Sequence, residues 1–184
     1  TTVEAVDQCS KITLDGQTDA TVAVADKASG LALLTPAKPL SPPVFAEFQT
    51  GGRVGADVAV AGYSYEDRLP APVLTFGRLE ETAGLNGEPG LKRLSLDALA
   101  GDAGGPGVEP TGTVIGMLLP AATPAATGKQ LPPGVHFAIA ASEIAKVLAP
   151  TGSPALPGTR QGAIPPAELG DIGTGMTVLV SCWD

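Results

Sequence analysis

Short apolar runs broken by glycine and proline are the feature that most restricts what this chain can fold into. The 184 residues include 24 glycines and 18 prolines, and the apolar segments between them have the length of single strands. Since 43% of the residues are hydrophobic but only 4% are aromatic, the core must be built from small aliphatic side chains. The pattern predicts an all-β protein of one domain or two small lobes, arranged as barrels or a sandwich.

The predicted strands fall into two sets along the chain. Two alternating runs within residues 11–26 are joined by Asp15-Gly16, a strong hairpin signal. A continuous apolar run follows at 30–35, and the proline-rich segment 36–52 is expected to connect the two sets. The second set of predicted strands comprises residues 53–64, 72–82, 91–99, 112–121 and 135–140, with a last strand at 176–183.

A single segment has the pattern of a helix. Residues 142–148 align aliphatic side chains on one face, and Ser142 is expected to cap the start. The proline-rich stretch 122–134 is expected to be a turn. Residues 149–175, rich in glycine and proline, are expected to cross the surface and carry the last strand back over the first lobe. A recognition segment of polyproline character is the alternative for that stretch.

Charge and composition exclude several classes of function. The formal net charge is −8, from 11 Lys+Arg and 19 Asp+Glu, and no basic cluster is present to bind nucleic acid or anionic lipid. No apolar run reaches the length of a membrane-spanning helix. Two cysteines and one histidine without ligand spacing argue against a metal site, and we expect no cofactor.

The two cysteines, Cys9 and Cys182, lie near opposite ends of the chain. Their number and positions leave two states open, a disulfide bond and a pair of unpaired buried thiols. A bridge across so long a loop would contribute about 5 kcal/mol in the entropic model.

Residues 94–120, LSLDALAGDAGGPGVEPTGTVIGMLLP, resemble the nucleophile region of trypsin-like serine proteases, especially the bacterial Deg-type branch. In that family a strand leads into a Gly-Asp/Asn-Ser-Gly-Gly-Pro turn whose backbone N–H groups form the oxyanion hole. Gly101, Asp102, and the Gly-Gly-Pro of residues 104–106 match this turn, whereas Ala103 stands where the family has its serine.

Four more segments resemble the same family in the same order: residues 1–14, 29–36, 58–81 and 134–148. The resemblance covers roughly residues 1–148. It implies two β-barrel lobes of the trypsin fold with a C-terminal helix. It also implies that the first lobe is short by two or three strands, which residues before Thr1 or a neighbouring chain would supply.

The catalytic triad of the family falls on residues that cannot perform its chemistry. The histidine position falls on Glu4, the aspartate position on Gly30 and the serine position on Ala103. Without a nucleophile and without a general base, the mechanism has no first step. The resemblance therefore implies a natural pseudoprotease.

Other candidate residues are interpreted more plainly. His136, Phe137 and Ala138 match the substrate-cleft strand of the family, and His136 is expected to be an ordinary strand residue. Glu4 and Asp102 could form a carboxylate pair for acid–base catalysis, but two solvated loop acids are the expectation.

Two features at the chain ends complete this interpretation. An N-terminal threonine hydrolase at Thr1 is disfavoured, because such enzymes need helix layers that this sequence does not predict. The resemblance also implies a Cys9–Cys182 bridge, since related proteins carry a cysteine after the histidine segment and a terminal V-x-C-W strand. Such a bridge points to an oxidising compartment, the periplasm or the cell exterior.

The expected organisation has three parts. Residues 1–50 form the remainder of the first lobe with the connection, 51–150 form the second lobe with the helix, and 151–184 form the crossing and last strand. We expect a protein- or peptide-binding or scaffolding subunit of a larger assembly. A hydrolase with an unrecognised or partner-completed site is one alternative, and a purely structural subunit whose missing strands come from a neighbour is another.

Overall fold

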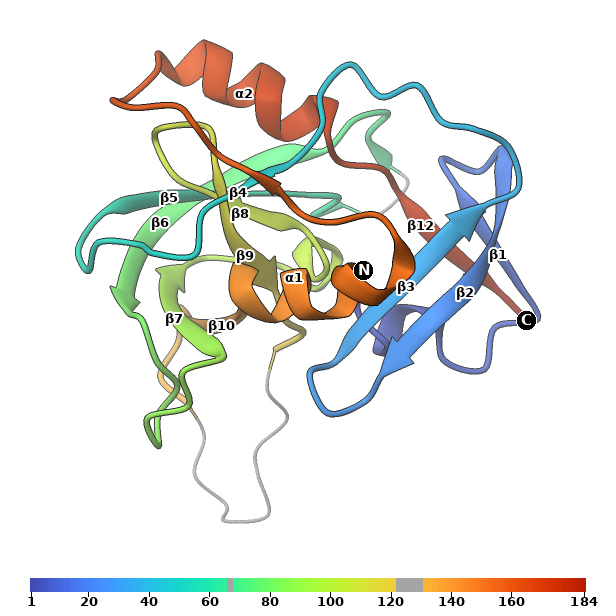
Figure 1. Cartoon of the computed structure of the whole chain (residues 1–184), viewed down its shortest axis with the longest axis horizontal. Helices are drawn as coiled ribbons and strands as arrows, with labels where there is room; N and C mark the ends of the chain where they lie inside the picture. The colour runs from blue at the N-terminus through green and yellow to red at the C-terminus, as the bar shows by residue number, and fades with distance from the viewer. Residues whose placement is uncertain (66–67, 122–130) are drawn as a thin grey trace.

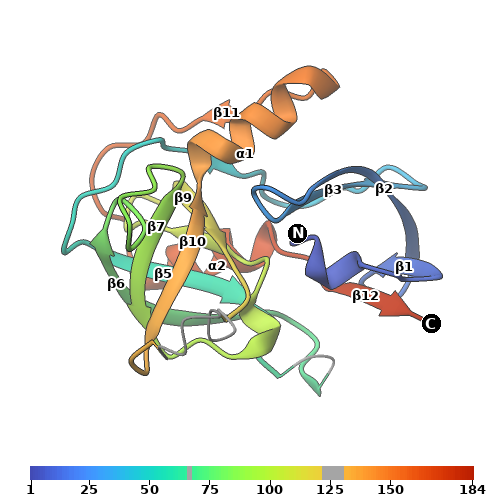
Figure 2. The ribbon, with the colours of Figure 1, turned by 90° about the horizontal axis from the view of Figure 1, so that it is seen from below.

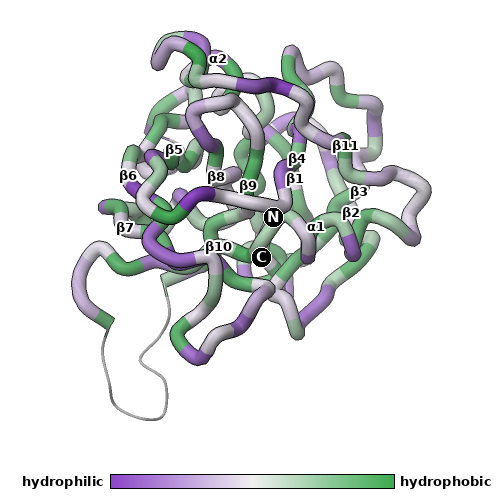
Figure 3. Tube along the Cα trace, turned by 60° about the vertical axis from the view of Figure 1, so that its left-hand side comes forward, coloured by the Kyte–Doolittle hydropathy of each residue, from purple (hydrophilic) through white to green (hydrophobic). Residues whose placement is uncertain are grey.

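Two β lobes lie side by side in the computed structural model, which describes residues 1–65, 68–121 and 131–184 (Figures 1 and 2). Apolar and polar stretches alternate along the chain trace (Figure 3). The prediction of an all-β architecture is confirmed, with two helices added to the strands. Most of the predicted turn at 122–134 lies outside the described residues.

The first lobe is a four-stranded antiparallel sheet in the order β12-β1-β2-β3. The hairpin predicted at Asp15-Gly16 is confirmed, because φ is 50° at Asp15 and 67° at Gly16, between the first two strands. The last strand of the chain pairs with the first one, a pairing that the sequence did not predict, and it begins at residue 180 rather than 176. The strands are β1 (Lys11–Leu14), β2 (Thr18–Asp26), β3 (Leu31–Pro36) and β12 (Val180–Trp183).

The second lobe is a closed barrel of six strands. Its neighbours follow the order β10-β7-β6-β5-β8-β9, and β10 also pairs with β9, which closes the ring. The strands are β5 (Asp57–Gly62), β6 (Val73–Glu81), β7 (Leu91–Leu96), β8 (Pro106–Val108), β9 (Val114–Leu118) and β10 (Val135–Ala140). The interior holds Val58, Val60, Leu79, Leu94, Leu96, Ile115, Leu118 and Ala138, the aliphatic core that the composition requires.

Helix α1 (Ala141–Leu148) joins the two lobes. Its residues Ile144 and Val147 pack against Leu31 of the first lobe and against Met117 and Ile139 of the second. The helix is where the sequence predicts it, but the expected Ser142 cap is wrong. The N-cap residue is Ala140 and makes no side-chain cap, since β10 runs directly into the helix and fixes its first turn.

Residues 149–175 lead to the strand that pairs with β1 of the first lobe, but they are not a plain surface crossing. This stretch contains the 3-10 helix η4 (Ala149–Thr151), the short strand β11 (Leu156–Pro157) and the helix α2 (Pro166–Gly175). Strand β11 pairs in parallel with β4 (Glu47–Phe48), which lies inside the connection between the lobes. Helix α2 covers β5 and β6 of the second lobe (Figure 1).

None of the helices in the described residues is long and apolar enough to cross a membrane.

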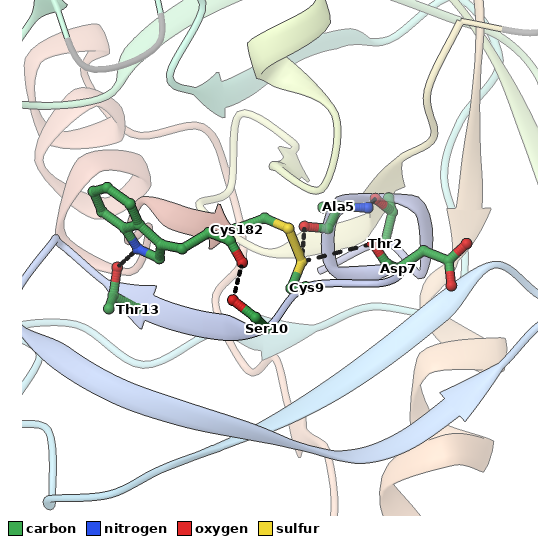
Figure 4. Close-up of a disulfide and its surroundings, with 8 residues drawn as sticks. Thr2, Ala5, Asp7, Cys9, Ser10, Thr13 and Cys182 are labelled. Atoms are coloured by element: carbon green, nitrogen blue, oxygen red, sulfur yellow. Dashed lines mark hydrogen bonds between the residues drawn. A yellow bond between two sulfur atoms is a disulfide. The ribbon is translucent and has the colours of Figure 1, made fainter.

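The disulfide between Cys9 and Cys182 is present, so the open question about the two cysteines is resolved (Figure 4). Their Cα atoms lie 5.3 Å apart, within the usual range for a bridge. Two hydrogen bonds support it. The Ser10 hydroxyl donates to the Trp183 carbonyl at 2.8 Å, and the Trp183 indole N–H donates to the Thr13 hydroxyl at 2.9 Å. The C-terminal strand is therefore fastened to β1.

Candidate functional site

A cleft of about 980 Å³ lies between the two lobes and brings together residues that are far apart in the sequence. Glu4 comes from the 3-10 helix η1 (Glu4–Val6) of the first lobe. Ala103 follows the 3-10 helix η3 (Ala100–Asp102), and His136 comes from β10. The cleft also contains Gly101, but Asp102 is not among its lining residues.

Gly30 lies next to this cleft rather than in it. Its carbonyl accepts a hydrogen bond of 2.8 Å from the Val3 amide, directly before Glu4. Gly30 and Glu4 both line an adjoining pocket of about 670 Å³. The backbone at Gly30 has φ of 77°, a left-handed conformation that residues other than glycine rarely adopt.

The turn at residues 100–103 offers neither a nucleophile nor a free amide at Ala103. The Ala103 side chain is a methyl group, and its N–H donates to the Ala100 carbonyl at 3.2 Å. The Asp102 N–H is also used, donating to the Leu99 carbonyl at 3.0 Å. An oxyanion is stabilised by converging N–H groups that are free to donate to it. The Ala103 N–H is not free, because it already donates to the Ala100 carbonyl within the 3-10 turn.

Asp102 is fully buried, so the expectation of a solvated loop acid is wrong for this residue. Its carboxylate accepts hydrogen bonds from the Ser64 hydroxyl at 2.5 Å, the Leu99 amide at 2.9 Å and the Thr75 hydroxyl at 3.4 Å. Burial is tolerable because these donors replace the lost water. Gly62 gives it room, since a Cβ there would lie 2.6 Å from Asp102 atoms.

Glu4 is exposed, as the sequence predicts, at the start of η1. The preceding Thr2 is buried, and its hydroxyl accepts a hydrogen bond of 3.3 Å from the Ala5 amide, which holds the turn. Thr1 lines the cleft beside the Ala103 turn, since a Cβ at Gly104 would lie 3.0 Å from the Thr1 hydroxyl oxygen. The carboxylate of Asp102 has its own partners, so a catalytic pair with Glu4 is not formed.

The strand β10 borders the cleft, and its residues become more buried toward the end of the strand. His136 and Phe137 are half-buried and Ala138 is buried. The strand pairs with β7 along residues 135–139 and with β9 along residues 138–140. The Phe137 carbonyl accepts a hydrogen bond of 2.9 Å from the Leu119 amide. Of the three residues, His136 lines the cleft.

The C-terminal segment 176–183 forms one wall of the cleft, which sequence reasoning missed. Asp15 of the β1–β2 turn holds this segment with two hydrogen bonds of 2.9 Å, from its amide to the Leu179 carbonyl and from the Leu179 amide to its carboxylate. The pKa of the Tyr63 hydroxyl is raised mainly by burial and, to a smaller extent, by the negative charge of Asp15. The sequence predicts a strand at 176–183 that returns over the first lobe, but not that this segment borders the cleft.

Within the described part of the chain, no three His, Cys, Asp or Glu side chains are grouped so that they could hold a metal ion.

Comparisons with known proteins agree with this geometry. A family model described as a trypsin-like peptidase domain matches residues 2–117. Among curated proteins, the uncharacterized protein y4bJ of Sinorhizobium fredii is 27% identical over 142 residues, which are 75% of this chain and 22% of that protein. The chain thus spans about a fifth of the length of this relative.

Solved structures show the same fold. The Rv3671c protease of M. tuberculosis in its inactive form is 26% identical, with a TM-score of 0.61 over 83% of this chain and 78% of that one. A serine endoprotease from Yersinia pestis is 20% identical, with a TM-score of 0.60 over 82% of this chain and 52% of that one. The second likeness concerns the fold alone.

Proposed function

This chain belongs to the trypsin-like peptidase domain family, and from that premise we propose that it is a pseudoprotease that binds a protein or peptide without cutting it. Its role is that of a binding or scaffolding subunit in a larger assembly. The cleft between the lobes is the site at which we expect binding.

The Ala103 turn is the observation that carries this proposal. A methyl group cannot attack a carbonyl carbon. The Ala103 amide already donates to the Ala100 carbonyl, so it does not stabilise a developing oxyanion. Asp102 holds the turn in this state through three side-chain hydrogen bonds. The missing nucleophile and the occupied amide at Ala103 therefore both support a chain that does not cut peptides.

The other two triad positions support the proposal independently. Glu4 is a carboxylate in place of a histidine, and Gly30 has no side chain. A Gly30→Asp change would place a side chain on backbone with φ of 77°, which is strained whatever space surrounds it. Returning the aspartate of the family would therefore cost conformational strain at this position.

The walls of the cleft suit a peptide rather than a small polar ligand. The lining is largely small and aliphatic, with Leu99, Leu118 and Leu119 from the second lobe. Strand β10 pairs with β9 only along residues 138–140, so on that side residues 135 and 136 could pair with the backbone of an extended peptide whose side chains lie on the apolar wall. The Cys9–Cys182 disulfide supports placement in the periplasm or outside the cell.

Hydrolysis tests the first half of the proposal. We expect no turnover of casein or of a peptide-substrate library, and no labelling by a fluorophosphonate probe, with an active trypsin-like protease as positive control. Turnover that disappears in Thr1→Ala, Glu4→Gln or Asp102→Asn would overturn the pseudoprotease assignment and favour an unrecognised hydrolase.

Selection from a displayed library of extended heptapeptides tests the second half. Leu99 is 49% exposed and lines the cleft, so Leu99→Arg should weaken the selected peptides about tenfold or more. Leu85, 58% exposed and not among the residues that line the cleft, gives the matched control Leu85→Arg, which should bind normally. Equal losses in both variants, or no selected peptide at all, would contradict binding in the cleft.

A further inference from the structure

Residues 38–43, Lys-Pro-Leu-Ser-Pro-Pro, lie in the connection between β3 and β4, and their prolines restrict the backbone to one conformation. Proline holds φ at about −65°, and the residue before a proline is driven toward extended conformations. Lys38 and Ser41 each precede a proline, so only Leu40 is without such a constraint. The backbone agrees, since none of these residues has a positive φ or a cis peptide bond. This proline segment is therefore suited to a polyproline II helix.

The proline segment is amphipathic in that conformation. A polyproline II helix has three residues per turn, so its side chains form three ridges along its length. Here two ridges are apolar and the third is polar. The ridges are, in that order, Pro39 with Pro42, Leu40 with Pro43, and Lys38 with Ser41. Segments with the spacing P-x-x-P dock into grooves lined by aromatic side chains.

The proline segment is open to a partner on the outside of the molecule. Figure 1 shows it as part of a light-blue arch that leads from β3 to β4. Leu40 is 41% exposed, and of the other five residues only Pro42 is half-buried while the rest are exposed. No backbone hydrogen bond joins the segment to any other residue that the structure describes. Neighbouring apolar side chains that remain exposed together mark a contact surface.

Both ends of the arch are held in place. At one end, the Ala37 amide donates to the Asp19 carbonyl at 2.8 Å. At the other end, Val44 contacts helix α2, since a Cβ at Gly175 would lie 2.9 Å from the Val44 Cγ2. Because the ends are fixed and the prolines restrict the middle, the segment has little conformational entropy to lose when it binds.

Lys38 gives the proline segment a charge that a partner can recognise. It carries the only formal charge between residues 35 and 46. It is exposed and forms no ion pair with a described residue. A positive charge directly beside two apolar ridges is complementary to a groove with a carboxylate at its rim.

We propose that residues 38–43 dock as a polyproline II helix into a groove lined by aromatic side chains on a partner domain, where Lys38 pairs with a carboxylate at the rim. The two apolar ridges contact the aromatic side chains, and Ser41 stays in water. None of these residues lines the cleft. The inference therefore goes beyond the proposed function and does not depend on what the cleft binds.

Binding of the intact protein to an array of purified SH3 and WW domains, which carry such grooves, tests the proposal. We expect at least one domain to bind, and a synthetic peptide of residues 35–46 to compete for it. Leu40→Glu should weaken binding about tenfold or more, whereas Ser41→Glu should change it by about twofold or less. The two variants add the same charge one residue apart, so the difference between them reports the apolar ridge.

Lys38→Glu tests the carboxylate at the rim. It should weaken binding to the same domain, and the loss should shrink as the salt concentration is raised. Equal binding by Lys38→Glu and the unmodified protein would contradict the ion pair.

Absence of binding across the whole array would overturn the proposal, as would equal losses in Leu40→Glu and Ser41→Glu. Binding that survives in Leu40→Glu, or that the peptide does not displace, would place the contact elsewhere on the molecule and also contradict it. Unchanged melting temperatures, expected because both side chains are exposed, exclude unfolding as the cause of a loss.

Discussion

The carboxylate of Asp102 stabilises the loop on which the family's chemistry depends. It is fully buried, and its three hydrogen-bond donors come from three separate segments, at Ser64, Thr75 and Leu99. Because the carboxylate is fully buried, these donors replace its lost water, and they tie the loop and the neighbouring strands to this one side chain. Glu4, in contrast, is exposed and outside this network.

Removal of this carboxylate should destabilise the fold. Asp102→Ala should lower the free energy of unfolding by roughly 2–4 kcal/mol, since three hydrogen bonds to a buried acceptor are lost. Glu4→Gln is the control, with an expected change within about 0.5 kcal/mol. Urea denaturation measures the free energy of unfolding of both variants. An unchanged value for Asp102→Ala would show that the hydrogen bonds of Asp102 contribute nothing to stability.

A second buried carboxylate should make stability depend on pH. Glu109 is 7% exposed and its Oε1 has no hydrogen-bond partner in the described structure. Burial raises the pKa of Glu109 above its ordinary 4.5, and the charges of Lys92 and Arg53 offset only part of this. The folded state therefore holds the proton more tightly than the unfolded state. The stability that this provides is complete below about pH 4.5 and is lost as the pH rises through the folded-state pKa.

Glu109→Gln should remove that loss. Relative to the unmodified protein, the variant should gain free energy of unfolding as the pH is raised from 4 to about 7, measured by urea denaturation. Glu80→Gln, at an exposed position of β6, should run parallel to the unmodified protein. A constant difference between Glu109→Gln and the unmodified protein would contradict the raised pKa.

At the scale of elements, helix α2 shows packing overriding local propensity. Its sequence PAELGDIGTG contains three glycines, each unfavourable in a helix by about 1 kcal/mol relative to alanine. Leu169 and Ile172 are nevertheless buried against the barrel. Gly173 allows close approach, because a Cβ there would lie 3.3 Å from the Ala61 methyl group. So short a helix depends on this contact.

Leu169→Ala should therefore cost about 2–4 kcal/mol of stability and loosen α2 selectively. Hydrogen exchange should accelerate in residues 166–175 while the barrel strand β9 stays protected. Ala167→Gly, at an exposed position of the same helix, controls for helix propensity alone. Uniform acceleration across the chain after Leu169→Ala would contradict a selective effect on α2.

At the scale of the whole molecule, α1 and the C-terminal segment span the two lobes, and the disulfide fixes the end of that segment within the first lobe. Helix α1 packs on both lobes. Segment 176–183 crosses from α2 to β1 and forms a wall of the cleft. The disulfide links residues 173 positions apart in the sequence, so it restricts nearly the entire unfolded chain.

A Cys9→Ser, Cys182→Ser variant should therefore lose about 5 kcal/mol in the entropic model, and its cleft should widen as β12 loosens. Differential scanning calorimetry measures the loss, and exchange at residues 180–183 locates it. Serine at both positions avoids a free thiol that could form another bridge. An unchanged melting temperature would show that hydrogen bonds alone hold β12.

Much of the fold could be predicted from local patterns. The β-hairpin at Asp15-Gly16 and the positions of the main strands follow from alternation and turn residues, which act over a few neighbours. The family resemblance also predicts which residues stand at the triad positions, because side-chain identity is written in the sequence. The disulfide was only one of two open states until the family resemblance favoured it.

The burial of side chains and their hydrogen-bond partners were decided by tertiary structure alone. The burial of Asp102, the occupied amide of Ala103 and the helix at 166–175 each depend on contacts between segments far apart in the chain. The same is true of β12 in its place beside β1. Local sequence specifies which side chains are present and which turns are easy, but burial and hydrogen-bond partners belong to the packed molecule. The residues of the Ala103 turn were therefore readable in advance, whereas the C-terminal wall of the cleft and the geometry of the site required the fold.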